Sequence, residues 1–273
     1  MPITGLQIKN KPEVSMLYNG DVKLEFNPGG HRYTIYIKGV KQFGTCGVTS
    51  VIGILDKPAL VQWSSNMCSD AWIEGLNNAD KIDELTIATL AKTAKLAWRV
   101  RRDTAGDIGT LIHAWIENYI NAKINTTQTP LPPENEMMNA AILKFLLWEK
   151  ENNITFTGAE LKLYSLKHNI AGTCDFTYVT RDGKLGIGDI KTSKGIYDTF
   201  YYQVAAYRYM MEEERSYTTG TTPIPYEEMT ILRVGKDDGE IQIKEVPNYK
   251  DYAKGFLACS YLYRLTNKNK KNY

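Results

Sequence analysis

The stretch 157–192, TGAELKLYSLKHNIAGTCDFTYVTRDGKLGIGDIKT, decides the fold of this chain. Residues 157–166, 171–180 and 185–192 have the apolar and alternating composition of strands, and the residues at 168–169 and 181–183 are typical of turns. The sequence therefore predicts three consecutive, meandering strands here.

Upstream of these strands the pattern is mainly helical, and downstream it predicts a helix, two strands and a last helix. A β-hairpin is predicted from 22–26 and 33–37, joined by the turn residues 27–30. One helix is expected to be capped by Thr49 or Ser50, and the next to carry Pro58 in its first turn. The other expected elements are a helix to about Arg102, a helix from about Asp107 to 122, a loop at 125–133, helices at 134–151, 197–214 and 249–266, and strands at 228–235 and 239–246.

This order predicts a mixed α/β fold (α+β) in which a central mixed β-sheet is flanked by helices. We expect an N-terminal hairpin and helical region over 1–105, a core over 106–266 and a basic tail over 267–273.

The composition sets limits on the class of protein. The 273 residues are 43% hydrophobic and 23% charged, as in ordinary globular domains. The four cysteines form no CxxC pair, so we expect neither a zinc knuckle nor a disulfide framework. No apolar run is long enough for a membrane span, and Met1 to Lys11 lack the apolar run of a signal peptide. We therefore expect a cytoplasmic protein, in a bacterial cell or a phage-infected host.

Two aspartates lie inside otherwise apolar predicted strands. Asp175 stands between Cys174 and Phe176, and Asp189 precedes Ile190 in the last strand of the stretch. An ionised carboxylate is costly to bury, and two on neighbouring strands also repel each other. A divalent cation relieves both penalties, and Mg²⁺ prefers carboxylates together with water and phosphate oxygens. The alternative is a structural pair held by turns or arginine partners.

Lys191 follows Asp189 by two residues and is therefore expected on the same face of the strand. A lysine beside a metal-bound water can orient that water or stabilise charge on a phosphate. The D-x-K spacing is weak by itself, because it recurs at Asp182–Lys184 and in related form at Glu160–Lys162. The strand context favours Asp189–Lys191.

Further candidates are spaced along the flanking elements. His113 and Glu117 share one helical face at i,i+4, as do Gln203 and Tyr207. Glu160, one strand before Asp175, is expected either to reach the same metal or to be a surface acid. Amide, hydroxyl and ammonium groups suit phosphate or sugar contacts, which applies to Gln203, Tyr207, Thr192, Ser193 and Lys194.

The net charge of +2 does not by itself indicate a nucleic-acid partner. However, Lys92, Lys95, Arg99 and Arg102 follow a 3,4,3 spacing that predicts one basic helical face, to which Arg101 adds. The C-terminal segment carries Arg264, Lys268, Lys270 and Lys271. The alternative for both patches is a solvated face or tail.

In order along the chain, the motifs are Gly109-Thr110-Leu111-Ile112-His113 with Glu117, Glu160, Gly172-Thr173-Cys174-Asp175, Asp189-Ile190-Lys191-Thr192 and Gln203-x-x-x-Tyr207. This set resembles the RecB-like exonuclease group of the PD-(D/E)XK nuclease superfamily, which includes phage recombination and repair exonucleases. The motifs span about 109–207, and 48–63 resembles the N-terminal part of phage-type members less specifically.

The resemblance implies a restriction-endonuclease-like core and Mg²⁺- or Mn²⁺-dependent hydrolysis of phosphodiester bonds in DNA. It implies metal ligation by His113, Asp175 and Asp189 with the Ile190 carbonyl, a catalytic Lys191, and substrate contacts by Gln203 and Tyr207. We expect Glu117 to orient His113 or to assist a second metal. Cys174 replaces the proline of the superfamily name, and the cysteine spacing does not match the iron–sulfur members, so no cluster is expected.

The expected activity is exonucleolytic, in DNA end processing, recombination or repair, on linear single- or double-stranded DNA. Arg99, Arg102 and Lys194 would follow the DNA backbone, and a single-strand annealing or binding protein is an expected type of recombination partner. Two alternatives remain: a catalytically inert nucleic-acid-binding module, and a sequence-reading endonuclease on the same core.

Overall fold

The computed structural model describes residues 11–235 and 240–269, apart from the side chains of residues 59, 101–109, 268 and 269. The chain divides into two compact units. One consists of the chain up to Ile54 and from Leu111 onward, and the other is Leu55–Thr110. The first unit therefore joins the N-terminal strands to the later sheet, whereas the sequence suggested a boundary near residue 105.

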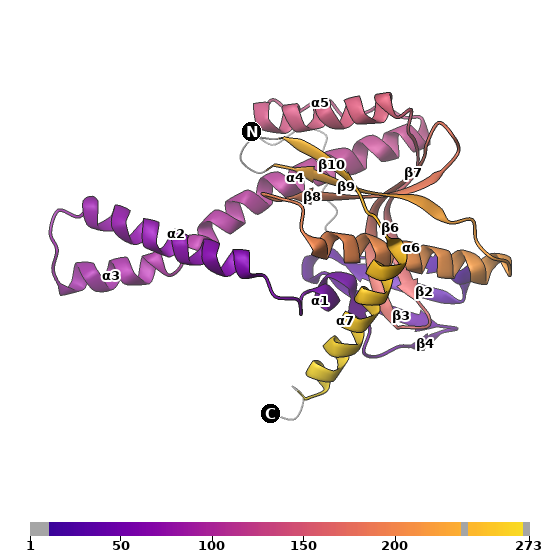
Figure 1. The fold of residues 1–273 in the computed structure, drawn as a ribbon, viewed down its shortest axis with the longest axis horizontal. Helices are drawn as coiled ribbons and strands as arrows, with labels where there is room; N and C mark the ends of the chain where they lie inside the picture. The colour runs from indigo at the N-terminus through magenta and orange to yellow at the C-terminus, as the bar shows by residue number, and fades with distance from the viewer. Residues whose placement is uncertain (1–10, 236–239, 270–273) are drawn as a thin grey trace. The chain divides into compact units, whose positions relative to one another are not determined.

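The central sheet of the first unit is mixed and lies between helices, as the sequence predicts (Figure 1). Five of its six strands follow the order β10-β9-β8-β7-β5. The sixth, β6, pairs with the edge of β7 that faces away from β8. The β6–β7 and β7–β8 pairs are antiparallel, while β8–β9 is parallel. The strands are β5 (Cys46–Gly47), β6 (Thr155–Ser165), β7 (Ile170–Val179), β8 (Leu185–Thr192), β9 (Tyr226–Val234) and β10 (Ile241–Glu245).

A second, four-stranded antiparallel sheet extends the predicted hairpin. The hairpin strands are confirmed as β2 (Val22–Asn27) and β3 (Arg32–Ile37), and β1 (Glu13–Leu17) and β4 (Val40–Lys41) lengthen the sheet on either side. Alternate residues of β2 and β3 pack with Tyr164 and Ala171 of the central sheet into one buried cluster. The two sheets therefore share a core.

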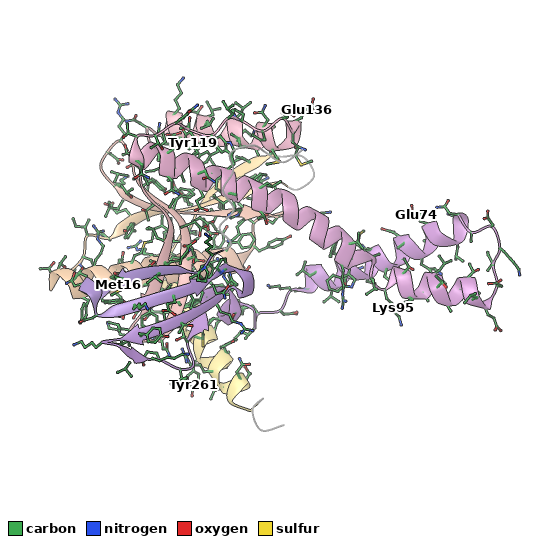
Figure 2. The ribbon with its side chains drawn as sticks, turned by 180° about the vertical axis from the view of Figure 1, so that it is seen from behind. Met16, Glu74, Lys95, Tyr119, Glu136 and Tyr261 are labelled. Carbon is green, nitrogen blue, oxygen red and sulfur yellow. The ribbon has the colours of Figure 1, made fainter. Side chains whose placement is uncertain are left out.

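Helices cover both faces of the central sheet. On one face, α4 (Ala97–Asn125) and α5 (Glu136–Glu151) contribute to an aromatic cluster. Phe145 of α5 and Phe156 of β6 contact Phe176 of β7, and Tyr119 of α4 contacts Phe145 and Phe156. Figure 2 shows these two helices side by side, with Tyr119 labelled on α4 and Glu136 labelled on α5. On the other face lies α6 (Asp198–Thr219), against which α7 (Tyr249–Asn269) packs.

Local signals explain several of the helix ends. Asn135 caps α5 by accepting a hydrogen bond from the Met138 amide at 3.0 Å, and Gly220 ends α6 in the left-handed conformation, at φ 67°. By contrast, α1 (Val48–Ile52) has Gly47 at its N-cap and no side-chain cap, so the expected capping by Thr49 or Ser50 is wrong. Within the described residues, no helix has the length and apolar character needed to cross a membrane.

Two glycines in β8 allow the aromatic cluster to lie flat on the sheet. A Cβ atom at Gly188 would stand 1.9 Å from the Phe176 ring, and one at Gly186 would stand 2.2 Å from the Tyr178 ring. Real Cβ contacts are never this short, so the two glycines are required by packing.

The second unit contains two helices that pack against each other, α2 (Pro58–Asn77) and α3 (Glu84–Ala94). Pro58 is in the first turn of α2, as predicted, and Asp83 caps α3 through the Thr86 amide at 2.9 Å. The first half of α4, to Thr110, also belongs to this unit.

Two predictions for this region are wrong. The helix expected to reach Arg102 stops at Ala94, and a new helix begins at Ala97, so the spacing of Lys92, Lys95, Arg99 and Arg102 does not describe one continuous helical face. No helix starts near Asp107 either, because α4 runs unbroken from Ala97 to Asn125. Lys95 and Leu96, where the break occurs, are both good helix formers, and therefore the sequence gives no sign of it.

Candidate metal centre

The pairing between β7 and β8 stops at one row of residues. The ladder runs from Val179 opposite Leu185 to Phe176 opposite Gly188. The next row would place Asp175 opposite Asp189, and there the strands no longer pair. Instead, the Asp175 carboxylate (Oδ2) accepts a hydrogen bond from the Ile190 amide at 2.6 Å. The side chain of Asp175 thus takes the position of a lost interstrand hydrogen bond.

Glu160 occupies the same row on the other edge of β7. Its neighbours Ala159 and Leu161 pair with Phe176 and Cys174, which sets Glu160 opposite Asp175. Opposite residues of an antiparallel pair project from the same face of a sheet. Glu160, Asp175 and Asp189 therefore form a row of three carboxylates across three strands, which we call the carboxylate row. Glu160 has a φ of +51°, a strained conformation for a residue without special tolerance of it.

Asp189 is the most deeply buried member of the row, with no exposed surface. Neither of its carboxylate oxygens has a well-aligned hydrogen bond within the described residues, although the Lys191 ammonium lies 2.5 Å from Oδ2. Burial raises the pKa of Asp189 to about 6, against the opposing effect of Lys191 and with a further contribution from the Asp175 charge. This carboxylate thus has less compensating positive charge than its burial requires.

The pKa values of the other two carboxylates are raised as well. Burial and the charge of Asp175 raise the pKa of Glu160 to about 7, even though Lys162 lies 3.2 Å from its Oε2. Burial also raises the pKa of Asp175, despite Lys191 and the hydrogen bond from Ile190. Lys162 itself is buried and also contacts Glu13 of β1 at 3.3 Å.

His113 approaches the row from α4. Its Nδ1 lies 3.7 Å from Asp175 Oδ2, and the nearby Ile190 backbone favours its protonated form. Burial, followed by the Lys191 charge, lowers the pKa of His113, so its imidazole is neutral at neutral pH. A neutral imidazole is the form that ligates metals. Glu117, one turn further along α4, is close enough that its charge raises the pKa of both Glu160 and Asp175.

A pocket of about 220 Å³ lies over the carboxylate row. His113, Glu160, Asp175 and two α6 residues, Gln203 and Tyr207, contribute to its lining. The Gln203 amide donates to the Tyr207 hydroxyl at 2.6 Å, and both side chains are almost fully buried. The Tyr207 ring fits against β7 because residue 172 is glycine, where a Cβ atom would stand 2.8 Å from it.

The residues of this centre fit a hard divalent cation in their chemistry. Two or three carboxylates, a neutral imidazole and a backbone carbonyl are ligands of the right type, and the buried oxygens of Asp189 have no hydrogen-bond partner within the described residues. The side chains are not gathered as a finished site, however. Within the described residues, no three His, Cys, Asp or Glu side chains stand together closely enough to hold one ion. The Lys191 ammonium instead provides the nearest positive charge to Asp189.

Comparisons with known proteins identify no family for this chain. No protein-family model matches it, and no curated protein does. A solved structure titled "Crystal structure of SSO0001" is similar over 83% of this chain and 78% of that one, at 15% sequence identity and a TM-score of 0.36. A likeness this low supports no inference about activity.

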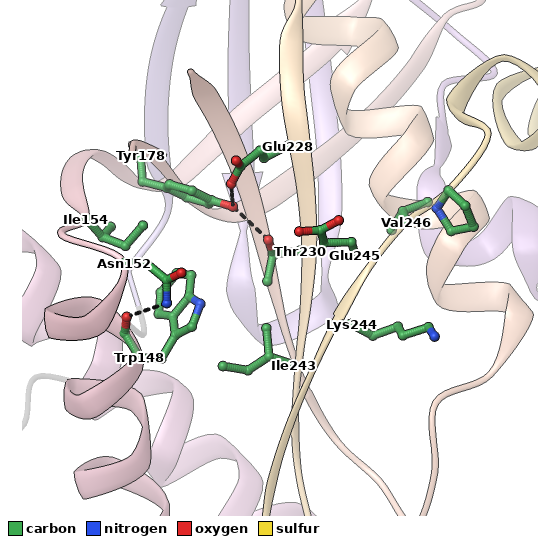
Figure 3. Close-up of a pocket in the computed structure, with 11 residues that line it drawn as sticks. Trp148, Asn152, Ile154, Tyr178, Glu228, Thr230, Ile243, Lys244, Glu245 and Val246 are labelled. Atoms are coloured by element: carbon green, nitrogen blue, oxygen red, sulfur yellow. Dashed lines mark hydrogen bonds between the residues drawn. The ribbon is translucent and has the colours of Figure 1, made fainter. Parts of the chain in front are cut away.

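A larger pocket, of about 580 Å³, is lined by residues of α5, β7, β9 and β10 (Figure 3). The Tyr178 hydroxyl lies there 2.6 Å from that of Thr230 and 3.4 Å from a Glu228 oxygen. Glu245 also lines this pocket, and its charge and that of Glu228 contribute to raising the pKa of Tyr178, after burial. Lys244 lines the pocket as well, so its lining carries two carboxylates and one ammonium, a balance that disfavours a phosphate group.

None of the remaining predicted contact residues with described side chains is among those that line the pocket over the carboxylate row. The Ser193 hydroxyl donates to the Gly195 carbonyl at 2.7 Å, in the segment after β8 where Thr192 and Lys194 also lie. Arg99 belongs to the second unit, with its guanidinium over the Trp98 ring, and the side chain of Arg102 is outside the described residues.

Arg264 is not part of a basic tail. It lies on α7, where its guanidinium donates to the carbonyls of Gly44, His168 and Asn169 at 3.1, 2.6 and 3.0 Å. Of the expected tail, residues 267–269 continue α7, the Lys268 side chain is not described, and Lys270 and Lys271 lie outside the described residues.

Sequence reasoning did not select four residues of this centre. Phe26, His31 and Tyr33 of the second sheet line the pocket, and Lys162 pairs with Glu160. A signal for Lys162 was present, because Glu160 and Lys162 have the same spacing and strand context as Asp189 and Lys191. No local signal could place the hairpin aromatics beside residues more than 100 positions away.

Proposed function

We propose that this chain is a divalent-metal-dependent deoxyribonuclease that hydrolyses phosphodiester bonds and acts from DNA ends. One observation carries the proposal: in a row of three carboxylates, the most buried one, Asp189, forms an ion pair with Lys191 but has no hydrogen-bond partner within the described residues. The resemblance of the motifs to RecB-like exonucleases supports the same function.

Asp175, Asp189, His113 and the Ile190 carbonyl would hold Mg²⁺ or Mn²⁺, with Glu160 next in the row. A bound ion of this type lowers the pKa of a water molecule and polarises a phosphate oxygen. Lys191 emerges from the same face of β8 as Asp189, so its ammonium can turn from that carboxylate towards a phosphate. Its pKa stays above the ordinary value, because the charges of Asp189 and Asp175 outweigh the lowering effect of burial. Lys191 therefore acts as a charged group and not as a base.

The flanking residues would fix these groups in place. The hydrogen bond from the Ile190 amide holds Asp175, and the buried pair of Gln203 and Tyr207 closes one side of the pocket. His113 is kept neutral by burial and by Lys191, so it can act as a ligand without losing a proton first. Glu117 would orient His113 or hold a second ion through water.

Plasmid DNA tests the proposal directly. The purified protein is incubated with linear plasmid, closed circular plasmid and end-labelled single- and double-stranded oligonucleotides, in Mg²⁺, Mn²⁺ or EDTA. We expect degradation of linear DNA in either metal, none in EDTA, and an intact circle. Nicking of the circle would indicate an endonuclease instead. Binding to DNA without any cleavage, in all metals, would indicate an inert binding module and contradict the proposal.

A matched pair of variants ties the activity to this centre. Asp189→Asn removes the buried carboxylate, whereas Asp182→Asn makes the same change in a turn, at a side chain paired with Thr180 and Lys184. The first variant should lose activity and the second should retain it. Equal activity of the two would show that hydrolysis occurs elsewhere.

A further inference from the structure

The second sheet contributes an aromatic wall to the pocket over the carboxylate row. Phe26, His31 and Tyr33 all line this pocket, opposite residues of β6, β7 and α4. The three rings contact one another, with centroids 5.0 Å apart for Phe26 and Tyr33, 5.2 Å for Phe26 and His31, and 5.8 Å for His31 and Tyr33. We call these three residues the aromatic wall.

The wall continues beyond what the core requires. Phe26 and Tyr33 are cross-strand neighbours on the face of the hairpin that carries Leu24 and Ile35, which are fully buried in the shared core. Phe26 is still buried, but Tyr33 is only half-buried and His31 is exposed. The Lys162 ammonium lies 4.5 Å from the centroid of the Phe26 ring, so the accessible aromatic surface at this pocket belongs to His31 and Tyr33.

The position of the wall is fixed relative to the carboxylates. The Tyr33 hydroxyl is 2.9 Å from that of Thr173, two residues before Asp175 on β7. Two residues of a strand span about 7 Å, which is of the order of one nucleotide step. The His31 backbone is held in a tight turn, since its amide donates to the Pro28 carbonyl at 3.2 Å, and its ring contacts those of Phe26 and Tyr33. The aromatic wall is therefore preformed in the absence of a ligand.

The chemistry of the wall suits a flat, uncharged group. Burial, with the charge of Lys162, lowers the pKa of His31, and burial raises the pKa of Tyr33 to about 12, so both rings are neutral near neutral pH. A neutral aromatic face attracts a nucleobase and gives little attraction to a phosphate.

We propose that the aromatic wall is a stacking subsite for the nucleobase adjacent to the cleaved phosphodiester bond. This inference rests on the nuclease function proposed above and names the part of the substrate that the hairpin recognises. Stacking is tolerant of base identity, because every base has an aromatic face. The subsite thus positions the terminal nucleotide without selecting its sequence.

Fluorescence and abasic substitution test this subsite separately from catalysis. The full-length protein is titrated with oligonucleotides in Ca²⁺, carrying 2-aminopurine at one of the terminal positions. We expect quenching at one position in the wild type, and loss of that quenching in Tyr33→Ala and His31→Ala. Tyr33→Phe retains the ring and should retain the quenching, although it loses the hydroxyl contact with Thr173.

Affinity gives the second readout. Loss of one stacked base should weaken binding between about 5-fold and about 100-fold. An abasic nucleotide at the quenched position should weaken wild-type binding to the same extent, and should weaken Tyr33→Ala no further, because the interaction is already gone. Tyr36→Ala is the matched control, as Tyr36 lies on the same strand with its side chain on the opposite face.

The outcomes separate this inference from the nuclease proposal. If the wild type degrades linear DNA but Tyr33→Ala and His31→Ala bind normal and abasic DNA as it does, the subsite is refuted and the nuclease stands. If the wild type neither binds nor cleaves DNA, the nuclease proposal itself fails. Should Tyr33→Ala fail to fold, judged by circular dichroism, the exposed His31→Ala decides the question by itself.

Discussion

Replacing Asp189 with asparagine should make the metal-free protein more stable. The pKa of this buried carboxyl is raised from its ordinary value of 3.8 to about 6, a rise of about 2 pH units. Each unit corresponds to about 1.4 kcal/mol, so ionised Asp189 costs about 3 kcal/mol of folding free energy. Asparagine has a similar size and no charge, and it removes this cost.

The sign of the effect depends on pH. Because the folded-state pKa lies above the unfolded-state value, the stability contributed by protonated Asp189 is present below about pH 4. It is lost as the pH rises to about 6. The variant should therefore match the wild type near pH 4 and exceed it above pH 6. In a chain of this length, about 3 kcal/mol corresponds to a midpoint about 5 to 10 °C higher.

Thermal unfolding followed by circular dichroism, in EDTA and in Mn²⁺ at pH 5 and pH 8, measures both parts of the prediction. Wild-type protein should gain about 3 kcal/mol when Mn²⁺ is at 100 times its dissociation constant, and Asp189→Asn should gain almost nothing. Asp182→Asn, at an exposed turn, is the control and should respond to Mn²⁺ as the wild type does. A variant less stable than the wild type in EDTA at pH 8, or equally stabilised by Mn²⁺, would refute the reasoning.

Three further substitutions probe neighbouring groups. Lys191→Met should reduce single-turnover hydrolysis by about 100- to 1000-fold, yet bind Mn²⁺ at least as tightly in calorimetry, because no ammonium competes for the carboxylate. Weaker Mn²⁺ binding by that variant would contradict this explanation. Gly188→Ala places a Cβ atom 1.9 Å from the Phe176 ring and should lower the unfolding free energy by about 1–3 kcal/mol or more, measured in urea, whereas Gly29→Ala, with its nearest neighbour at 3.5 Å, should change it little. Lys162→Met leaves two glutamates without their buried partner and should cost about 3–5 kcal/mol in urea at pH 8, but less at pH 5, where the neighbouring carboxyl with a pKa of about 7 is protonated. An equal loss at both pH values would assign the effect to packing.

The central strands, the flanking helices and the mixed sheet were predictable, because their periodicity and turn residues all favour the same fold. The helix break at Lys95 and Leu96 was not, since both residues are good helix formers. The two short strands at the edges of the second sheet also escaped prediction, because strands of two to five residues give too few alternations to recognise.

At the candidate site, the fold places His113 near Asp175 and Lys191 near Asp189, whereas the predicted DNA-contact residues 192–194 are not among those that line the pocket. Apolar flanks around Asp175 and Asp189 are a local signal, and strand order alone makes these residues neighbours. The contribution of His31 and Tyr33 depends on how one sheet packs on another, which no local pattern encodes. The metal ligation and the DNA contacts assigned to these residues remain predictions.

The opening of the strand pair at Asp175 also bears on how the protein should be dissected. The Asp175 carboxylate has two roles. One oxygen replaces a backbone acceptor for the Ile190 amide, and the group as a whole belongs to the carboxylate row. Alanine at this position would leave an amide without its acceptor and deform the strand that bears Lys191. Loss of activity in such a variant would say little about ion binding. For the proposed nuclease, an inactive but correctly folded variant with which to trap a DNA complex is better made at residue 189 or 191.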